Sequence, residues 1–102
     1  MKIVQQGETV SVSDLQQLAA ANATHFRSAI RAAMPSRPNR IDIDLSQTEF
    51  LDCNGVGALI ALRKCARQRN ARVIVRLLSP TVATRRLLRL TGLDSLFPIE
   101  AF

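Results

Sequence analysis

Phe50-Leu51-Asp52-Cys53-Asn54-Gly55-Val56-Gly57-Ala58-Leu59 is the stretch that decides the fold of this 102-residue chain. It starts with two apolar residues, passes through a polar turn, and ends in an apolar helical pattern. Asp and Asn favour the N-cap of a helix, so Asp52, Cys53 or Asn54 is expected to cap a helix over residues 54–68. The stretch therefore predicts a connection that leads directly into a helix with polar groups at its start.

The predicted helix over 54–68 has an apolar side and a basic side. The residues expected to be buried are Val56, Leu59, Ile60, Leu62 and Ala66, and those expected to face water are Arg63, Lys64 and Arg67. Cys53 and Cys65 lie twelve residues apart. That spacing is about 18 Å along a helix, whereas a disulfide needs Cα atoms within about 7 Å. The two thiols therefore predict no disulfide.

Two strands and a helix are predicted upstream of this stretch. Lys2–Gln5 and Thr9–Ser13 are expected to form two short strands around a turn, because apolar and polar residues alternate in the second. A helix is expected over 19–34, where Phe26 and Ile30 belong to an apolar stripe and a proline follows the last residue.

The strand predicted over 40–45 alternates apolar and acidic residues. One face carries Ile41, Ile43 and Leu45, and the other carries Asp42 and Asp44. A period of two is typical of a strand with one face in the core and one face away from it.

A strand and a helix are predicted downstream. Arg72–Leu77 is rich in β-branched residues. Ser79 is expected to be the N-cap of the next helix, with Pro80 at its first position. The residues expected to line one face of this helix are Val82, Ala83, Leu87 and Leu90. Gly92 suits the left-handed residue that ends a helix, and a short terminal segment is expected at 96–99.

The order of elements is therefore β-β-α-β-α-β-α. Such alternation predicts an α/β fold with one small mixed sheet, parallel β-α-β crossovers and helices packed on it. The length predicts a single domain over residues 1–102.

Several function classes are disfavoured by what the sequence lacks. It has no run of about 18 apolar residues and no secretory signal at its start, so a cytoplasmic location without a transmembrane segment is expected. One His and two Cys without ligand spacing predict no metal site. We find no nucleophile–base pair and no glycine-rich phosphate motif, so neither an enzyme nor a cofactor is expected.

The positive charge is concentrated in one half of the chain. The net charge is +6, and residues 53–93 hold nine Lys and Arg side chains and no acid. This pattern fits an acidic protein partner, an anionic membrane surface or nucleic acid, although solvated helix faces are the simpler interpretation. Nucleic-acid binding is an alternative of another class, but the lack of Tyr, Trp and any recognisable motif disfavours it.

Three stretches together resemble the STAS domain family, which is named for sulfate transporters and anti-sigma-factor antagonists. Ile41–Ser46 is similar to the family's strand that ends in Asp-Leu-Ser. Phe50–Leu59 is similar to the motif F-[LIM]-D-S-[ST]-G-[LV]-G-x-L, and Leu87–Ile99 to the C-terminal L-x-x-T-G-L-x-x-x-F-x-I. The order and spacing of the stretches agree with the family, and the resemblance covers residues 8–100.

The resemblance implies a protein-binding module of the anti-sigma-factor-antagonist kind, which regulates transcription by partner switching. Such an antagonist binds an anti-sigma factor that is also a serine kinase, and that binding frees the sigma factor. The kinase phosphorylates the second hydroxyl residue of D-S-[ST]-G, and the phosphate ends the interaction. Related STAS proteins are tails of anion transporters or small subunits docked on an ABC-type ATPase, so a transporter ATPase is the alternative partner.

This sequence departs from the family at the switch. Cys53 replaces the first Ser, and Asn54, at the phosphoacceptor position, has no hydroxyl. A phosphate would bring a charge of about −1.5 to −2 close to Asp52, so its absence removes the usual release signal. The resemblance implies that the partner contacts Asp52, Cys53, Asn54 and Gly55. Binding to the partner would then be retained, while its control by phosphorylation would be lost. The sequence leaves open whether the chain forms a homodimer.

Each of these residues also has a plainer interpretation. Cys53 is either a reactive thiol at a helix start or a small buried residue in place of Ser, and the second is favoured. Asn54 is a partner contact, the helix cap, or both. Cys65 is predicted to be core and His25 solvated surface. The segment 14–18 lacks the glycine that is common there in the family.

Overall fold

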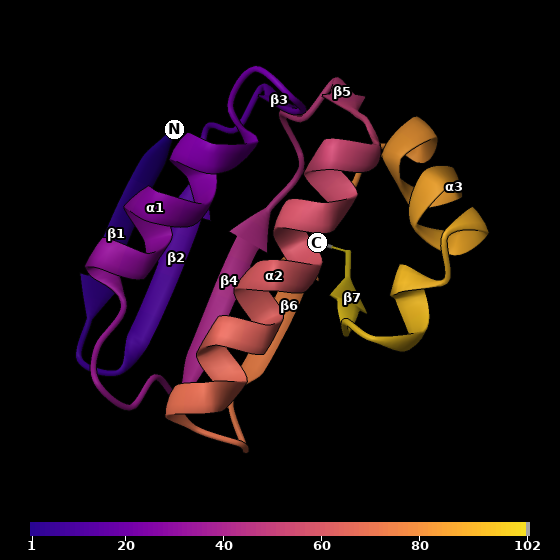
Figure 1. Cartoon of the computed structure of the whole chain (residues 1–102). Coiled ribbons are helices and arrows are strands. Elements are labelled where there is room, and N and C mark those ends of the chain that lie inside the picture. The colour runs from indigo at the N-terminus through magenta and orange to yellow at the C-terminus, as the bar shows by residue number, and fades with distance from the viewer. Residues whose placement is uncertain (102) are drawn as a thin grey trace.

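A five-stranded mixed sheet is the centre of the computed structural model, which describes residues 1–101. The strand order is β1-β2-β4-β6-β7, with β1 antiparallel to β2 and all other neighbours parallel (Figure 1). The strands are β1 (Lys2–Gln6), β2 (Thr9–Ser13), β4 (Arg40–Asp44), β6 (Ile74–Leu78) and β7 (Ile99–Glu100). The predicted α/β class with one small mixed sheet is confirmed.

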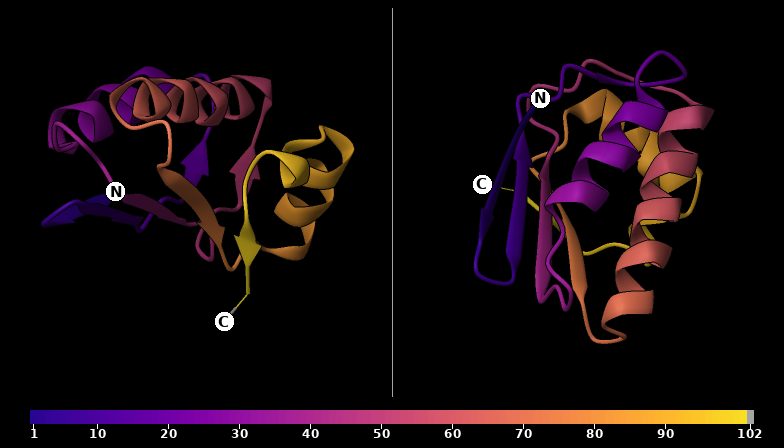
Figure 2. Two further views of the ribbon diagram at one scale, coloured as in Figure 1. Left: turned by 90° about the horizontal axis from the view of Figure 1, so that it is seen from below. Right: turned by 60° about the vertical axis from the view of Figure 1, so that its left-hand side comes forward.

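Helices cover one face of this sheet. α1 (Ala23–Ala33) and α2 (Cys53–Arg69) lie side by side on it, and α3 (Val82–Leu90) lies at the edge next to β7 (Figure 2). α3 ends at the left-handed Gly92, with φ 76°, as predicted, and a short 3-10 turn η1 (Leu93–Ser95) follows. Within residues 1–101 the other face of the sheet carries no helix.

A second, two-stranded sheet pairs β3 (Gln17–Leu18) with β5 (Phe50–Leu51) in parallel. The sequence pattern predicts neither strand as such, because two residues are too few to show a period.

The first helix begins later than the sequence pattern predicts, at Ala23 and not at residue 19. Asn22 Oδ1 accepts a hydrogen bond from Ala19 N at 2.9 Å, and this turn delays the helix to Ala23.

The core lies between the sheet and the pair of helices α1 and α2. Its central side chains are Ile41 and Ile43 from β4, Leu45 just after it, Phe26 and Ile30 from α1, and Leu59, Leu62 and Ala66 from α2, all at most 2% exposed. Full burial of one Leu, Ile or Phe side chain stabilises a fold by about 1.5–3 kcal/mol. The predicted inward faces of the strand at 40–45 and of the first helix are therefore confirmed, and in the second helix Val56 and Ile60, also predicted to be buried, are half-buried against the core.

The start of α3 differs from the prediction. Thr81, and not Ser79, is the N-cap, since its side-chain oxygen accepts a hydrogen bond from Thr84 N at 3.2 Å. Ser79 instead continues the end of the sheet: its N–H donates to Glu100 O at 2.6 Å, and its φ is 50°. Pro80 consequently precedes the helix and does not begin it.

The buried face of α3 also differs from the prediction. Val82 and Leu90 are 80% and 77% exposed, whereas Thr84 and Leu88 are buried. Arg85, Arg86 and Arg89 share one side of this helix, and the opposite side, which carries Thr84, Leu87 and Leu88, is the one that packs. The prediction is wrong because it assigns Val82 and Leu90 to the same face as Leu87 and leaves Leu88 out. A buried hydrogen bond from Thr84 Oγ1 to Thr48 O, at 3.4 Å, contributes to the observed orientation.

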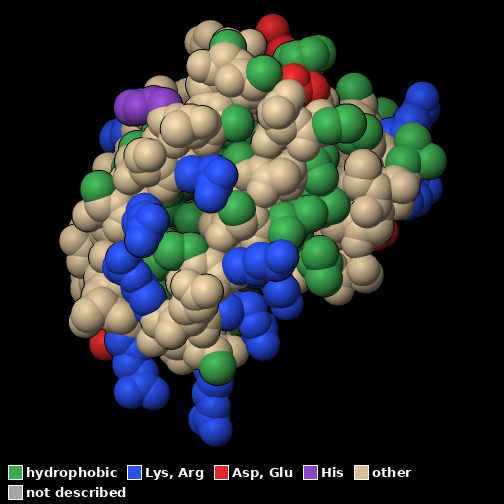
Figure 3. Space-filling view, viewed as in Figure 1, with side chains coloured by type: hydrophobic (Ala, Val, Ile, Leu, Met, Phe, Trp, Pro, Cys, Tyr) green, Lys and Arg blue, Asp and Glu red, His purple; other side chains and the backbone are tan. Residues whose placement is uncertain are grey.

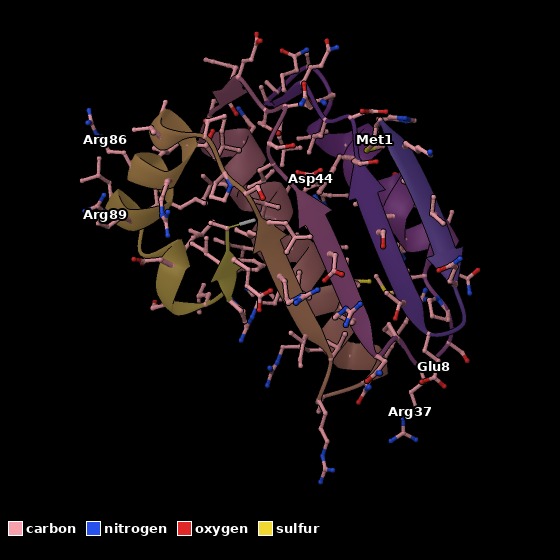
Figure 4. The ribbon with its side chains drawn as sticks, turned by 180° about the vertical axis from the view of Figure 1, so that it is seen from behind. Met1, Glu8, Arg37, Asp44, Arg86 and Arg89 are labelled. Atoms are coloured by element: carbon pink, nitrogen blue, oxygen red, sulfur yellow. The ribbon has the colours of Figure 1, made fainter. Side chains whose placement is uncertain are left out.

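Figure 4 shows the sheet face that the helices leave open. An ion-pair cluster of Asp42 in β4 with Arg40 and Arg76 lies on this face. Asp42 points away from the core as predicted, yet it is only 7% exposed because Arg76 and Arg40 cover it. Arg76 stands opposite Asp42 in the register and binds both carboxylate oxygens, at 2.7 and 3.0 Å. It also donates to Glu100 Oε2 at 2.6 Å. The hydrogen bonds that Arg76 donates to Asp42 raise the pKa of Arg76 above its already high ordinary value.

We expect Arg76→Met to lower the free energy of unfolding by about 2–3 kcal/mol, because it leaves the largely buried Asp42 carboxylate without its bidentate partner. The double variant Arg76→Met with Asp42→Asn should recover part of this loss. Urea unfolding of the single and double variants measures both values. Arg72→Met, at an exposed position, is the matched control, and an equal loss for both single variants would contradict the buried pairing.

Candidate functional site

The start of α2 is a turn capped by Asp52. Its Oδ1 accepts a hydrogen bond from Gly55 N at 3.0 Å, and its backbone carbonyl accepts one from Val56 N at 3.0 Å. The first bond satisfies an N–H group that has no partner within the helix, and the second is the first regular bond of the helix. Of the three predicted cap candidates, Asp52 is therefore the cap, and the prediction that Asn54 fills this role is wrong because Asn54 lies inside the first turn.

Asp52 also joins the start of α2 to the segment before α1. Its Oδ2 accepts a hydrogen bond from Ala20 N at 3.3 Å, across 32 positions of sequence. The N–H of Gly55, followed by that of Ala20, holds the pKa of Asp52 below its ordinary value, which partial desolvation opposes. The local hydrogen bond predicted as one role of Asp52 is thus present and extends to a second segment.

Gly55 is placed where no side chain fits. A Cβ built on this residue would lie 1.9 Å from the carbonyl oxygen of Leu18 and 2.7 Å from a methyl carbon of Leu51. The first turn of α2 therefore packs directly on the backbone of β3. Gly57, one glycine further along, has no heavy atom within 4 Å of its own Cβ position. The two glycines of the motif have different roles, and only Gly55 is required by close contact.

The two residues between the cap and Gly55 point away from this contact. Cys53 and Asn54 are both exposed, and Cys53 is a free thiol. The prediction that Cys53 is a small buried residue is wrong, since Asp52 and Gly55 occupy the inward positions of the turn. Asp52 to Gly55 lie at the start of the second helix as predicted, but Gly55 is buried and only the middle of the turn is open to solvent.

A groove lies next to the residues that lead into this turn. Phe50 is 55% exposed. It forms a groove of about 200 Å³ with α3. The residues lining it are Glu49, Phe50, Leu51, Ala83, Thr84 and Leu87. We call Phe50, Cys53, Asn54, Ala83 and Leu87 the α2–α3 surface. Sequence reasoning missed the contribution of α3, because it assigned Ala83 and Leu87 to the core face of that helix.

One further hydrogen bond holds the segments around the turn. Thr48 is fully buried, and its Oγ1 donates to Leu15 O at 2.6 Å.

Asp14 adopts a left-handed backbone with φ 54°. Asp is among the few residues other than glycine that tolerate this region, which accounts for a tight turn in a segment without the family's glycine.

The predicted plain roles of two other residues are partly changed. His25 is exposed, as predicted, and Cys65 is half-buried at a groove between α1 and α2 and does not lie fully in the core. Among residues 1–101, no helix is long and apolar enough to span a bilayer. The same residues contain no group of three or more His, Cys, Asp or Glu side chains arranged to hold a metal ion.

Residues 1–98 match a family model described as Mlab, STAS domain. The chain therefore belongs to the STAS domain family. Its sequence has no significant match among curated proteins.

Solved structures of anti-sigma factor antagonists share the fold. A putative antagonist from Thermotoga maritima has a TM-score of 0.83 at 23% identity, covering 97% of this chain and 84% of that chain. SpoIIAA in its unphosphorylated form has a TM-score of 0.76 at 19% identity, with 96% and 85% covered. The Bacillus cell fate determinant SpoIIAA in its phosphorylated form has a TM-score of 0.67 at 18% identity, with 96% and 88% covered.

The two glycines of the motif give a matched pair of variants. We expect Gly55→Ala to destabilise the fold by about 3 kcal/mol or more, because its methyl group would overlap the backbone of Leu18. Gly57→Ala should be neutral or stabilising by up to about 1 kcal/mol, since alanine favours the helix and meets nothing there. Thermal unfolding of both variants is the measurement, and similar stabilities would contradict the close packing of α2 on β3.

Asp52 predicts a pH dependence with a definite sign. Because its pKa is lowered in the folded state, its contribution is complete above the unfolded pKa of about 3.9 and is lost as pH falls through the folded pKa. The difference in Tm between the wild type and Asp52→Asn should therefore be constant from pH 5 to 7 and shrink below pH 4. A difference that persists unchanged to pH 2 would argue against the charged cap.

Proposed function

We propose that this chain is a cytoplasmic, non-catalytic STAS module that binds a kinase-like anti-sigma factor through the α2–α3 surface and acts as its antagonist. The observation that carries the proposal is the exposed polar turn of Cys53 and Asn54 beside the exposed ring of Phe50. An apolar patch rimmed by polar groups is typical of a protein interface. In this proposal Asp52 and Gly55 position the turn, and Cys53 and Asn54 contact the partner.

Docking in this proposal is not controlled by phosphorylation at position 54. Asn54 is exposed in the first turn of α2, where the family's phosphoacceptor stands, but an amide cannot accept a phosphate from a serine kinase. The carboxylate of Asp52 lies at the same helix end. An added anion at position 54 would meet this fixed negative charge. The wild-type surface therefore stays permanently competent to bind.

A second candidate partner is the ATPase of an ABC-type transport complex. The observation that favours it is the same missing hydroxyl, because a subunit that stays assembled needs no release switch. Both candidates use the α2–α3 surface and differ in the identity of the ATPase that it contacts. Calorimetric titration of the chain against purified anti-sigma and ABC-type ATPases from the same genome separates them. Binding to neither class would overturn both candidates.

The docking surface predicts the effect of three substitutions on partner affinity. Asn54→Asp should weaken binding about tenfold by imitating part of the phosphate charge. Phe50→Ala should weaken it by a similar factor, because exposed aromatic residues are frequent anchors of interfaces. Ile74→Ala is the matched control: Ile74 is 49% exposed at the start of β6, which follows the C-terminal end of α2 and not its first turn, and its loss should leave affinity within about twofold.

The stability of these variants keeps the result interpretable. An added carboxylate at position 54 gains from the N-terminal end of the α2 dipole but stands close to the charge of Asp52, so the Tm of Asn54→Asp is measured together with its affinity. A loss of affinity in a variant that is still fully folded at the temperature of the titration then reports on docking. Asn54→Ser supplies the missing hydroxyl. If the partner is a kinase-like anti-sigma factor, we expect that kinase to phosphorylate the new hydroxyl. Unchanged affinity of Asn54→Asp for a partner that binds the wild type would contradict the proposed surface.

A further inference from the structure

A groove between α1 and α2 is separate from the α2–α3 surface. Its volume is about 220 Å³. The residues lining it are Thr24, Arg27, Ser28 and Arg31 from α1 and Ala61, Leu62 and Cys65 from α2. Cys65 lies twelve residues beyond Cys53 on the same helix, which corresponds to about 18 Å. A ligand in this groove would therefore leave the start of α2 free.

The α1 wall of the groove is a stripe of polar side chains without partners. Thr24, Arg27, Ser28 and Arg31 follow the spacing that puts residues on one face of a helix. Within residues 1–101, none of the four side chains forms an ion pair or a hydrogen bond. Each guanidinium carries five N–H donors, and each hydroxyl can donate one more hydrogen bond. The wall thus offers many donors that the fold itself does not use.

The α2 wall is apolar. Leu62 is 2% exposed, so its side chain forms the floor, and Ala61 and Cys65 are half-buried beside it. The groove therefore combines a strip of hydrogen-bond donors on one side with a short apolar surface on the other. Such a combination fits a small molecule with one charged end and one apolar end.

The charge of both walls has one sign. Neither α1 nor α2 contains an Asp or Glu, whereas together they carry Arg27, Arg31, Arg63, Lys64, Arg67 and Arg69. Arg69 is held by the carbonyl oxygens of Met34 and Pro35. Figure 3 shows Lys and Arg side chains gathered over these two helices, around the hollow between them. A concave surface lined by one sign of charge attracts small ions of the other sign.

We propose that the α1–α2 groove binds a small soluble phosphate monoester, a function beyond the docking described above. A phosphate monoester carries a charge of about −1.5 to −2 and three acceptor oxygens, which matches two guanidinium groups and two hydroxyls. A carboxylate offers one charge and two oxygens. Arginine binds phosphate through two parallel hydrogen bonds, so Arg27 and Arg31 hold the phosphate and the ester's alkyl group lies on Ala61 and Leu62.

The size and lining of the groove define the ester further. Its volume of about 220 Å³ corresponds to roughly seven water molecules, enough for a phosphate and a short alkyl group. None of the residues within 1–101 that line it is aromatic, so a nucleobase would have no stacking partner among them. Monobutyl phosphate is therefore a suitable probe.

Titration of the full chain with monobutyl phosphate at constant ionic strength tests the site. Arg27→Ala and Arg31→Ala should each weaken binding about tenfold, since each removes a charge-assisted bidentate contact. Arg85→Ala and Arg89→Ala remove the same charge from α3 and should change affinity less than about twofold. Equal losses for the two pairs would overturn the site and leave only attraction to net charge. All four side chains are exposed, so the variants should keep the wild-type Tm.

The two cysteines provide a second readout in one molecule. Saturating monobutyl phosphate should slow alkylation of Cys65, which lines the groove, about fivefold or more, as expected for an occupied site. Cys53, at the exposed start of α2, should react at an unchanged rate. Protection of neither or of both thiols would contradict the proposal. Because the docking proposal involves neither Arg27 nor Cys65, a failure here leaves it untouched.

A third arm separates a soluble ester from a lipid headgroup with the same chemistry. Vesicles of phosphatidylcholine with and without phosphatidic acid are mixed with the protein and sedimented. We expect no phosphatidic-acid-dependent capture, because the groove is short and lies between two helices. Capture of the protein by these vesicles that depends on Arg27 and Arg31, without binding of monobutyl phosphate, would overturn the proposal of a soluble ligand.

Discussion

The close contact between Gly55 and the carbonyl oxygen of Leu18 is the constraint on which the candidate site depends. It brings the first turn of α2 onto the backbone of β3, with no room for a side chain between them. This close approach brings Asp52, which caps its own helix, within hydrogen-bonding distance of the N–H of Ala20. Because these inward positions are fixed, Cys53 and Asn54 face solvent. The exposure of the turn is therefore a consequence of packing on its other side.

Much of the fold was predictable, because its main elements carry strong periodicity. Alternation along β4 identified its buried face, and Phe26 and Ile30 identified that of α1. The strands β3 and β5 lacked such a signal, since two residues cannot show a period. In α3 the three arginines mark the polar side and Leu88 lies opposite them, but the prediction followed the apolar residues Val82 and Leu90, which are exposed.

The site was predictable in position but not in geometry. The motif placed a polar turn at the start of a helix, and local preference left three candidates for its cap. The choice of Asp52 rests on a second bond, to Ala20, that spans 32 positions. The burial of Cys53 was predicted wrongly for the same reason. The pairing of β3 with β5 decides which face of the turn packs on β3, and the sequence pattern did not predict that pairing. The groove between Phe50 and α3 depends on the orientation of that helix. Because the orientation of α3 was predicted wrongly, the groove was not predicted either.

The charges of α2 place its two proposed functions at opposite ends of one helix. A helix N-terminus with free N–H groups attracts anions, but here the carboxylate of Asp52 already occupies it. A phosphate at this end would meet both an occupied donor and a like charge. Further along, α2 faces the donors of Arg27 and Arg31 with no acidic residue on either helix. An anion is thus disfavoured at the surface where Asn54 replaces a phosphorylatable residue and favoured in the groove between α1 and α2. Protein docking and anion binding can therefore coexist on this small domain without competing for the same atoms.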